Sequence, residues 1–160
     1  MLDLSVIIFI FLSVTVLSPA CSSRSAEVSL WSVQVKTSGG FTGRGNGNVL
    51  VTSEGEVTYE KPTLPNVQQL PCKGTLSKEE LHSISEAVAQ TEPGGWHIAG
   101  LNVAAPDAFG YVLELRRGKQ VYQAHWYDNT REKLPGDLTK LFEAISVAQE
   151  RTAKKCEGRQ

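Results

Sequence analysis

The sequence lacks an excess of either charge. Its 16 Lys and Arg residues oppose 17 Asp and Glu, which leaves a formal net charge of -1, and no basic run occurs. Because proteins that bind nucleic acids need clustered positive charge to neutralise phosphates, we expect no nucleic-acid partner. Charged residues make up 21% and apolar residues 41% of the chain. These proportions exclude collagen, a coiled coil and a wholly disordered chain, and 160 residues suit a single domain.

Metal-binding spacings are also scarce. The imidazoles are His82, His97 and His125, and the pair considered as a possible metal spacing is His82 and Glu86 on a predicted helix. Such a pair is common on a solvated helix face, whereas a zinc site needs three or four convergent ligands. We therefore expect no metal, and we interpret His125 as a structural histidine within a strand.

Catalytic motifs are missing as well. The chain has no Gly-x-Ser-x-Gly elbow, and no Gly-Lys-Ser or Gly-Lys-Thr follows its glycines. The acidic pair Glu79 and Glu80 falls in the first turn of a predicted helix, where interaction with the helix dipole explains it. We expect no catalytic residue, no cofactor and no enzymatic activity.

A short apolar segment begins the chain. Residues 4–17 are apolar or small hydroxyl residues, a stretch too short for a membrane-spanning helix, and Ser18 and Ala20 are the small residues that a signal peptidase reads. We predict an export signal at 1–20 and a flexible linker at 21–29. Cys21 directly after Ala20 favours lipidation, although Ser18 stands where a lipobox normally has Leu. Simple secretion and an uncut signal anchor remain open. The expected location is extracytoplasmic, in the periplasm or at the cell surface, with or without a lipid in the membrane.

Three cysteines are an odd number for an exported protein. If Cys21 carries lipid, Cys72 and Cys156 remain as a pair in an oxidising compartment. Their separation of 84 residues is a poor zinc signature, so we predict a structural disulfide. On the chain-entropy model, a bridge closing so long a loop stabilises a fold by up to about 4 kcal/mol.

The hydrophobic patterns predict an α+β domain at 30–156, with a tail at 157–160. Alternating residues indicate strands, and Ser77 with Glu80 forms a capping box that opens a helix with an apolar face. A second apolar stripe follows Leu134-Pro135-Gly136. The order is β-β-β-α-β-β-α, an antiparallel sheet of about five strands with two helices on one face. The expected strands are 31–36, 48–52, 56–60, 109–116 and 120–126; the helices are 77–90 and 137–155; the irregular stretches are 61–74 and 96–107.

Five glycines in ten residues separate the first two strands. Glycine permits positive φ and close backbone approach, and Phe41 stands within the segment 38–47. An aromatic ring on an exposed glycine-rich tip is typical of a binding anchor, since it supplies contact area at low entropic cost. The alternative is that Phe41 packs into the core.

The segment 35–43, Val-Lys-Thr-Ser-Gly-Gly-Phe-Thr-Gly, resembles the Ser-Gly-Gly-Phe-x-Gly signature of the emfourins, small inhibitors of thermolysin-like (M4) metallopeptidases. Later motifs occur in a similar order: Leu-Ser-x-x-Glu-Leu at 76–81, Asp-x-Phe-x-Tyr at 107–111 and Leu-Pro-x-x-Leu-x-x-Leu at 134–141. The likeness spans about 32–147. It departs at 61–74, which resembles an insertion, and at 96–98, where the family has an aromatic pair followed by Leu-Pro.

The resemblance implies an inhibitor that occludes the cleft of an M4 metallopeptidase. We expect the chain to be a monomer. The candidate partner-binding residues are Ser38, Gly39, Gly40, Phe41 and Gly43. The alternative is an exported, lipoprotein-type interaction module without a protease partner, which would bind another ligand through the same loop or through the segment around Trp96. An enzyme without a recognisable motif is a third possibility.

Overall fold

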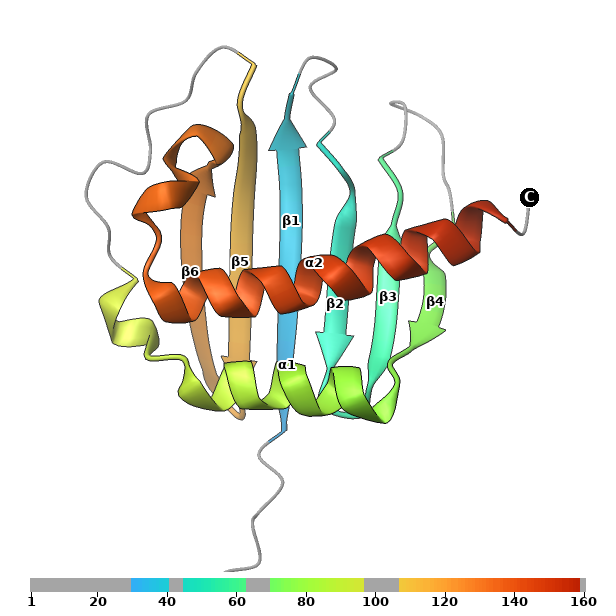
Figure 1. The fold of residues 1–160 in the computed structure, drawn as a ribbon, viewed down its shortest axis with the longest axis horizontal. Helices are drawn as coiled ribbons and strands as arrows, with labels where there is room; N and C mark the ends of the chain where they lie inside the picture. Colours follow the sequence, from blue (N-terminus) through green and yellow to red (C-terminus); the bar gives the residue numbers. More distant parts are fainter. Residues whose placement is uncertain (1–29, 41–44, 63–69, 97–106, 159–160) are drawn as a thin grey trace, which may run out of the picture.

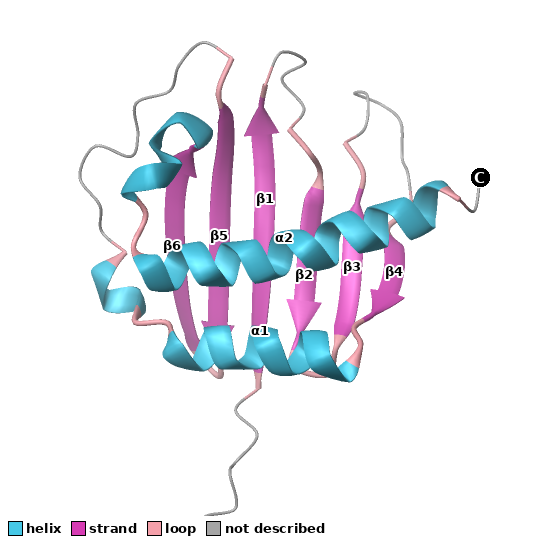
Figure 2. Ribbon diagram, in the orientation of Figure 1, coloured by secondary structure: helices cyan, strands magenta, loops and turns pink. Residues whose placement is uncertain are grey.

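The computed structural model describes residues 30–40, 45–62, 70–96 and 107–158. These residues form one antiparallel sheet in the order β4-β3-β2-β1-β5-β6, with the helices α1 and α2 on one of its faces (Figures 1 and 2). The α+β prediction is confirmed. The elements are β1 (Trp31–Gly39), β2 (Asn48–Thr52), β3 (Glu56–Glu60), β4 (Cys72–Thr75), α1 (Lys78–Gln90), the 3₁₀ turn η1 (Pro93–Gly95), β5 (Phe109–Arg117), β6 (Gln120–Tyr127), the 3₁₀ turn η2 (Asp128–Lys133) and α2 (Gly136–Glu157).

The core lies between the sheet and the two helices. In β1 the residues Trp31, Val33 and Val35 are buried while their neighbours are not, as the alternation predicts. The central position of β1, paired with β2 on one side and along nine residues with β5 on the other, explains why this strand is so regular. The opposite face of the sheet carries no helix in the described part of the chain (Figure 1).

Helix α1 begins and ends through specific hydrogen bonds. The predicted capping box is present: the Ser77 side chain accepts from the Glu80 amide, and the Glu80 carboxylate accepts from the Ser77 amide. At the other end the Arg117 guanidinium donates to the main-chain oxygens of Val88 and Thr91. Both helix ends are thus satisfied by the chain itself.

Helix α2 crosses the strands beside α1 (Figure 1). The buried residues of α2 recur at helical spacing and pack against the sheet, which confirms the predicted apolar face. Arg151 of α2 contacts the Glu80 carboxylate and the main-chain oxygen of Thr75, so it ties α2 to the start of α1. The buried residues of α2 are Leu138, Leu141, Phe142, Ile145, Ala148 and Thr152.

Three short elements were not predicted: the strand β4 and the 3₁₀ turns η1 and η2. β4 overlaps the end of the stretch 61–74 that was expected to be irregular, and it gives the sheet six strands where about five were expected. Its residues, Cys-Lys-Gly-Thr, have no apolar alternation, so only antiparallel pairing with β3 makes this segment a strand. The 3₁₀ turn η2 likewise depends on Thr130, whose hydroxyl bonds the main chain of Tyr127.

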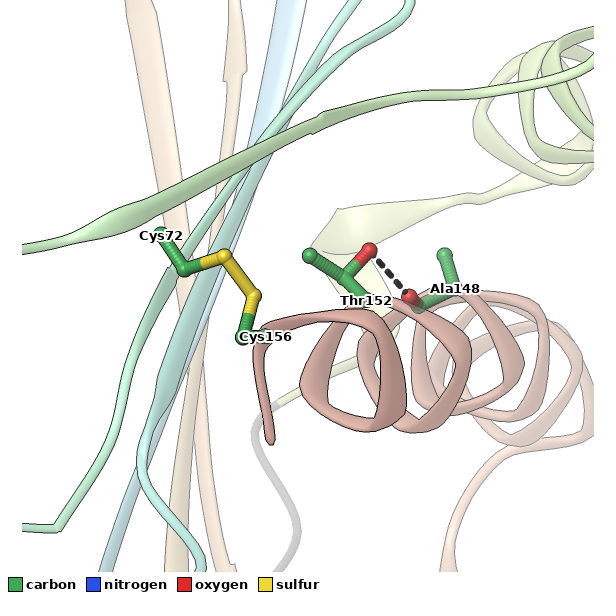
Figure 3. Close-up of a disulfide and its surroundings, with 4 residues drawn as sticks. All are labelled: Cys72, Ala148, Thr152 and Cys156. Atoms are coloured by element: carbon green, nitrogen blue, oxygen red, sulfur yellow. Dashed lines mark hydrogen bonds between the residues drawn. A yellow bond between two sulfur atoms is a disulfide. The ribbon is translucent and has the colours of Figure 1, made fainter. Parts of the chain in front are cut away.

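The Cys72–Cys156 disulfide is present and joins β4 to the last turn of α2 (Figure 3). The two Cα atoms lie 6.2 Å apart, within the range that a disulfide spans. A Cβ added at Gly74 would lie 3.3 Å from the Thr152 side chain, so glycine allows β4 to approach the helix closely. The bridge therefore anchors β4, the shorter of the two edge strands, to the helical layer.

The remaining predictions concern the ends of the chain. The export signal at 1–20, the linker at 21–29 and Cys21 lie outside the described residues. Among the described residues, no helix is both long enough and apolar enough to cross a membrane. Helix α2 includes Glu157, and Gly158 is its C-terminal cap.

Candidate binding site at the glycine-rich turn

The glycine-rich turn, residues 38–47, connects β1 to β2. The structure describes 38–40 and 45–47 and places both at one end of the sheet, the upper end in Figure 1. We call this end the loop end; β1, β3 and β6 finish there and β2 and β5 begin there. The predicted contact residues Phe41 and Gly43 lie outside the described residues.

Three glycines at the base of the turn could not be replaced without strain. Gly39, Gly45 and Gly47 have φ values of +80°, +68° and +90°, in the left-handed region that favours glycine. A Cβ would lie 2.4 Å from the Ala108 oxygen at Gly39, 2.5 Å from the Thr37 main chain at Gly45 and 2.4 Å from the Glu60 oxygen at Gly47. Neighbouring backbone therefore closes around the base on both sides.

Hydrogen bonds fix the two ends of the turn to each other. The Gly45 amide donates to the Gly39 oxygen at 2.9 Å. The Thr37 hydroxyl donates to the Gly47 oxygen at 2.7 Å and accepts from the Asn46 amide at 2.6 Å. Thr37 thus takes the place of ladder hydrogen bonds at the point where β1 and β2 separate.

Side chains from two other elements hold the turn from outside. The Tyr59 hydroxyl on β3 and the Gln149 side-chain nitrogen on α2 both donate to the Asn46 oxygen, each at 3.2 Å. Asn48 adds a bridge, since its side chain accepts from the Thr37 amide at 3.4 Å and donates to the Glu60 carboxylate at 3.1 Å. Sequence reasoning did not find these supports, because no local pattern relates Gln149 to Asn46.

The predicted contact residues that are described lie along the start of the turn. Ser38 is exposed, and Gly39 and Gly40 are half-buried. The Gly40 amide donates to the Ala108 oxygen at 3.2 Å, and a Cβ at Gly40 would lie 2.5 Å from the Phe109 ring. The start of the turn is therefore packed against the beginning of β5.

A groove of about 640 Å³ opens beside the turn, between α2 and the loop end of the sheet. Thr37 of β1 and Asn46 of the turn form part of its lining. The Tyr111 ring packs edge-to-face on Phe142 and stacks on buried Trp126. The remaining lining residues are Tyr59, Tyr111, Arg131, Phe142, Glu143, Ser146, Val147, Gln149, Glu150 and Ala153.

The charged residues at the rim of the groove form oppositely charged pairs, so neither sign of charge dominates there. Arg131 pairs with Glu143 at 3.3 Å, and Glu150 pairs with Lys154 at 2.7 Å. Burial raises the pKa of Tyr111, and the nearby Asp128 carboxylate raises it further against the opposing effect of Arg131. Burial likewise raises the pKa of Tyr59, with a smaller contribution from Glu157. Both phenols are therefore neutral at physiological pH, and the groove suits an uncharged surface.

Other residues singled out in the sequence lie away from this site. Trp96 and Trp126 are 5% and 0% exposed, so they belong to the core and cannot serve as exposed contacts. His82 and Glu86 lie 3.5 Å apart on the solvated face of α1, as expected. His125 is exposed beside Tyr127 rather than buried in the strand layer. Within 30–40, 45–62, 70–96 and 107–158, no group of three or more His, Cys, Asp or Glu could hold a metal ion.

No known protein family has a model that matches this chain, and no curated protein matches it. The resemblance to the emfourins therefore depends on the order and spacing of the motifs.

Proposed function

We propose that this chain is a proteinaceous inhibitor of thermolysin-like metallopeptidases and acts by occluding the active-site cleft. The observation that carries the proposal is the rigid base of the glycine-rich turn, where positive-φ glycines meet backbone on both sides. An inhibitor must fill a cleft without being turned over, which favours a loop whose conformation is fixed before binding. The emfourin-like motifs supply the class of protease.

The rigid base supports tight binding for an entropic reason. Ordering a flexible loop on association costs free energy, so a loop that is already ordered at both ends loses less on binding. The turn is held by Thr37 of β1, Tyr59 of β3 and Gln149 of α2. In the proposed complex the glycines allow the main chain to approach the cleft wall, and Phe41 enters an apolar subsite.

Titrating a thermolysin-like protease with the purified protein tests the proposal. We expect stoichiometric loss of peptidase activity, with the inhibitor still intact on a denaturing gel afterwards. Replacing Phe41→Ala together with Gly40→Asp is expected to weaken inhibition about a hundredfold, equivalent to about 2.7 kcal/mol. Phe41→Ala alone separates the loss of the anchor from the contact that a side chain at Gly40 makes with Phe109. Leu70→Ala, which removes a 93% exposed apolar side chain, is the matched control.

The second candidate is an exported interaction module without a protease partner. The groove favours it, because a neutral, partly aromatic recess of about 640 Å³ falls in the size range of ligand sites. Full protease activity in the presence of excess protein would favour this candidate over inhibition. Turnover of a substrate by the protein alone would instead support an enzyme.

A further inference from the structure

The two edges of the sheet differ in how they are protected from pairing with another chain. An edge strand presents unpaired main-chain groups, and proteins usually shield such an edge with a charged side chain, a proline, a short strand or a covering element. β4 has such protection: it is four residues long, contains Lys73 and Gly74, and is tied to α2 by the disulfide. Among the described residues, β6 at the other edge has none of these devices.

β6 runs for eight residues, Gln-Val-Tyr-Gln-Ala-His-Trp-Tyr, with no Asp, Glu, Lys, Arg, Pro or Gly. β2 also contains no charged residue, but it lies between β1 and β3 and is therefore not an edge strand. On the exposed edge, Val121, Gln123 and His125 are all accessible to solvent, and Val121 is 50% exposed. An uncharged strand of this length is unusual at the edge of a sheet, and no other described strand pairs with this side of β6.

The hairpin register shows which main-chain groups face outward. β5 and β6 join through a two-residue turn closed by Arg117 and Gln120, so alternate β6 residues from Gln120 bond to β5. The amides and carbonyls of Val121, Gln123 and His125 therefore point away from the sheet. Tyr127 also faces outward, but its main-chain groups are bonded to the Thr130 hydroxyl. The available edge ends at His125.

We propose that β6 is a dimerisation edge that pairs antiparallel with β6 of a second copy of this chain, about a two-fold axis at Gln123. This register sets Gln123 against Gln123 of the second copy and Val121 against His125 of the second copy. It aligns all three outward-facing residues and forms about six main-chain hydrogen bonds. On the helix side, it sets Tyr122 against Ala124 of the second copy, a large ring against a small side chain.

Charge complementarity favours a second copy over an unrelated strand. In this register Lys119 of the hairpin turn lies opposite Tyr127 of the second copy and next to its Asp128. Since the axis repeats this relation, the dimer gains two oppositely charged pairs, one at each end of the paired strands. The same symmetry makes the interface self-complementary, as a two-fold contact requires.

The dimer would be a continuous twelve-stranded sheet with all helices on one face. Its two loop ends would point in opposite directions, so each copy could engage a partner without obstructing the other. This inference is independent of the proposed protease inhibition, and it replaces the monomer expected from the sequence.

Sedimentation velocity of the purified chain over a roughly hundredfold range of concentration tests the dimer. The native chain is expected to sediment as a dimer that dissociates on dilution. Gln123→Pro removes the outward amide and should give a folded monomer, because a proline is tolerated where the amide faces solvent. Gln123→Ala is the matched control: it loses the same side-chain bond to Glu114 but keeps the amide, and should remain dimeric. If the circular dichroism spectrum shows that Gln123→Pro is unfolded, Val121→Pro and its control Val121→Ala provide a second pair of variants for the same test.

A cysteine at the axis gives a direct test of register. Paired Cα atoms lie about 5.5 Å apart at a hydrogen-bonded antiparallel site, which suits a disulfide. Under mild oxidation, Gln123→Cys should therefore form a covalent dimer. Ser83→Cys, on the exposed face of α1, should form no more covalent dimer than the native chain does. A native chain that stays monomeric throughout, or a dimer that survives both proline substitutions, overturns the proposal.

Discussion

Gln149 on α2 donates a hydrogen bond to the main-chain oxygen of Asn46, 103 residues earlier in the chain, at 3.2 Å. The same oxygen accepts from the Tyr59 hydroxyl on β3. One carbonyl therefore connects the glycine-rich turn to both layers of the domain. The conformation of the turn thus depends on the packing of α2 on the sheet.

The first prediction concerns Gly47. Replacing Gly47→Ala should lower the free energy of unfolding by about 2 kcal/mol, because a left-handed residue gains a Cβ that meets backbone. The contact is with the Glu60 oxygen at 2.4 Å. Gly94→Ala is the control, since a Cβ at Gly94 meets nothing within 4 Å. Urea unfolding followed by tryptophan fluorescence measures both, and equal midpoints for the two variants would contradict the described base of the turn.

The second prediction separates the two external supports of the turn. Tyr59→Phe and Gln149→Ala each remove one donor to the Asn46 oxygen and should each lower stability by about 1 kcal/mol or less. The double variant leaves that oxygen without either donor, so amide hydrogen exchange at Gly45 and Asn46 should accelerate more than the two single effects combined. Protease inhibition should weaken in parallel, by about tenfold.

Additive exchange rates in that double variant would mean that the two bonds act independently. Gln90→Ala, at the exposed end of α1, controls for loss of a glutamine from a helix surface.

The third prediction concerns the disulfide. Reducing Cys72–Cys156, or replacing both residues with Ala, should lower the free energy of unfolding by up to about 4 kcal/mol, because the unfolded chain regains the entropy of a long loop. Loss of the disulfide should destabilise β4 before the rest of the sheet, because β4 is otherwise held mainly by its pairing with β3 and its contact with α2. Hydrogen exchange at Lys73 and Gly74, compared with Val33 in the central strand, measures where the structure loosens. Uniform loosening across the sheet would contradict this local role.

The fourth prediction is a dependence on pH. Hydrogen bonds from Gln123 and Arg116 lower the pKa of Glu114 below its ordinary value of 4.5. Because the folded-state pKa is the lower one, the stabilisation is present above the unfolded-state pKa and is lost as pH falls through the folded-state pKa. The variant Glu114→Gln should therefore lose less stability than the native chain between neutral pH and the acid range below 4.5.

Urea midpoints at several acidic pH values measure this difference. Glu54→Gln, an equal change of charge on the exposed turn between β2 and β3, is the control. An acid response of Glu114→Gln that is as steep as that of the native chain would show that other carboxyl groups dominate.

Local patterns were enough for most of the elements. The alternation in β1 and β5 reflects one buried and one exposed sheet face, and Ser77 with Glu80 closes a capping box through neighbouring residues. β4 could not be predicted in this way, because Cys-Lys-Gly-Thr has no pattern of its own and is a strand only through its pairing with β3. The disulfide was predicted from cysteine count and spacing, which do not depend on local conformation.

The candidate site likewise has some features that the sequence predicts and others that depend on tertiary contacts. The clustering of glycines between two strands could be read from the amino-acid sequence, since composition and spacing need no folded structure. Which of these glycines meet neighbouring backbone, how Tyr59 and Gln149 hold Asn46, and which strands form the two edges of the described sheet became visible only in the folded structure. These features arise from contacts between residues far apart in the chain, and such contacts exist only after the sheet and helices have packed together.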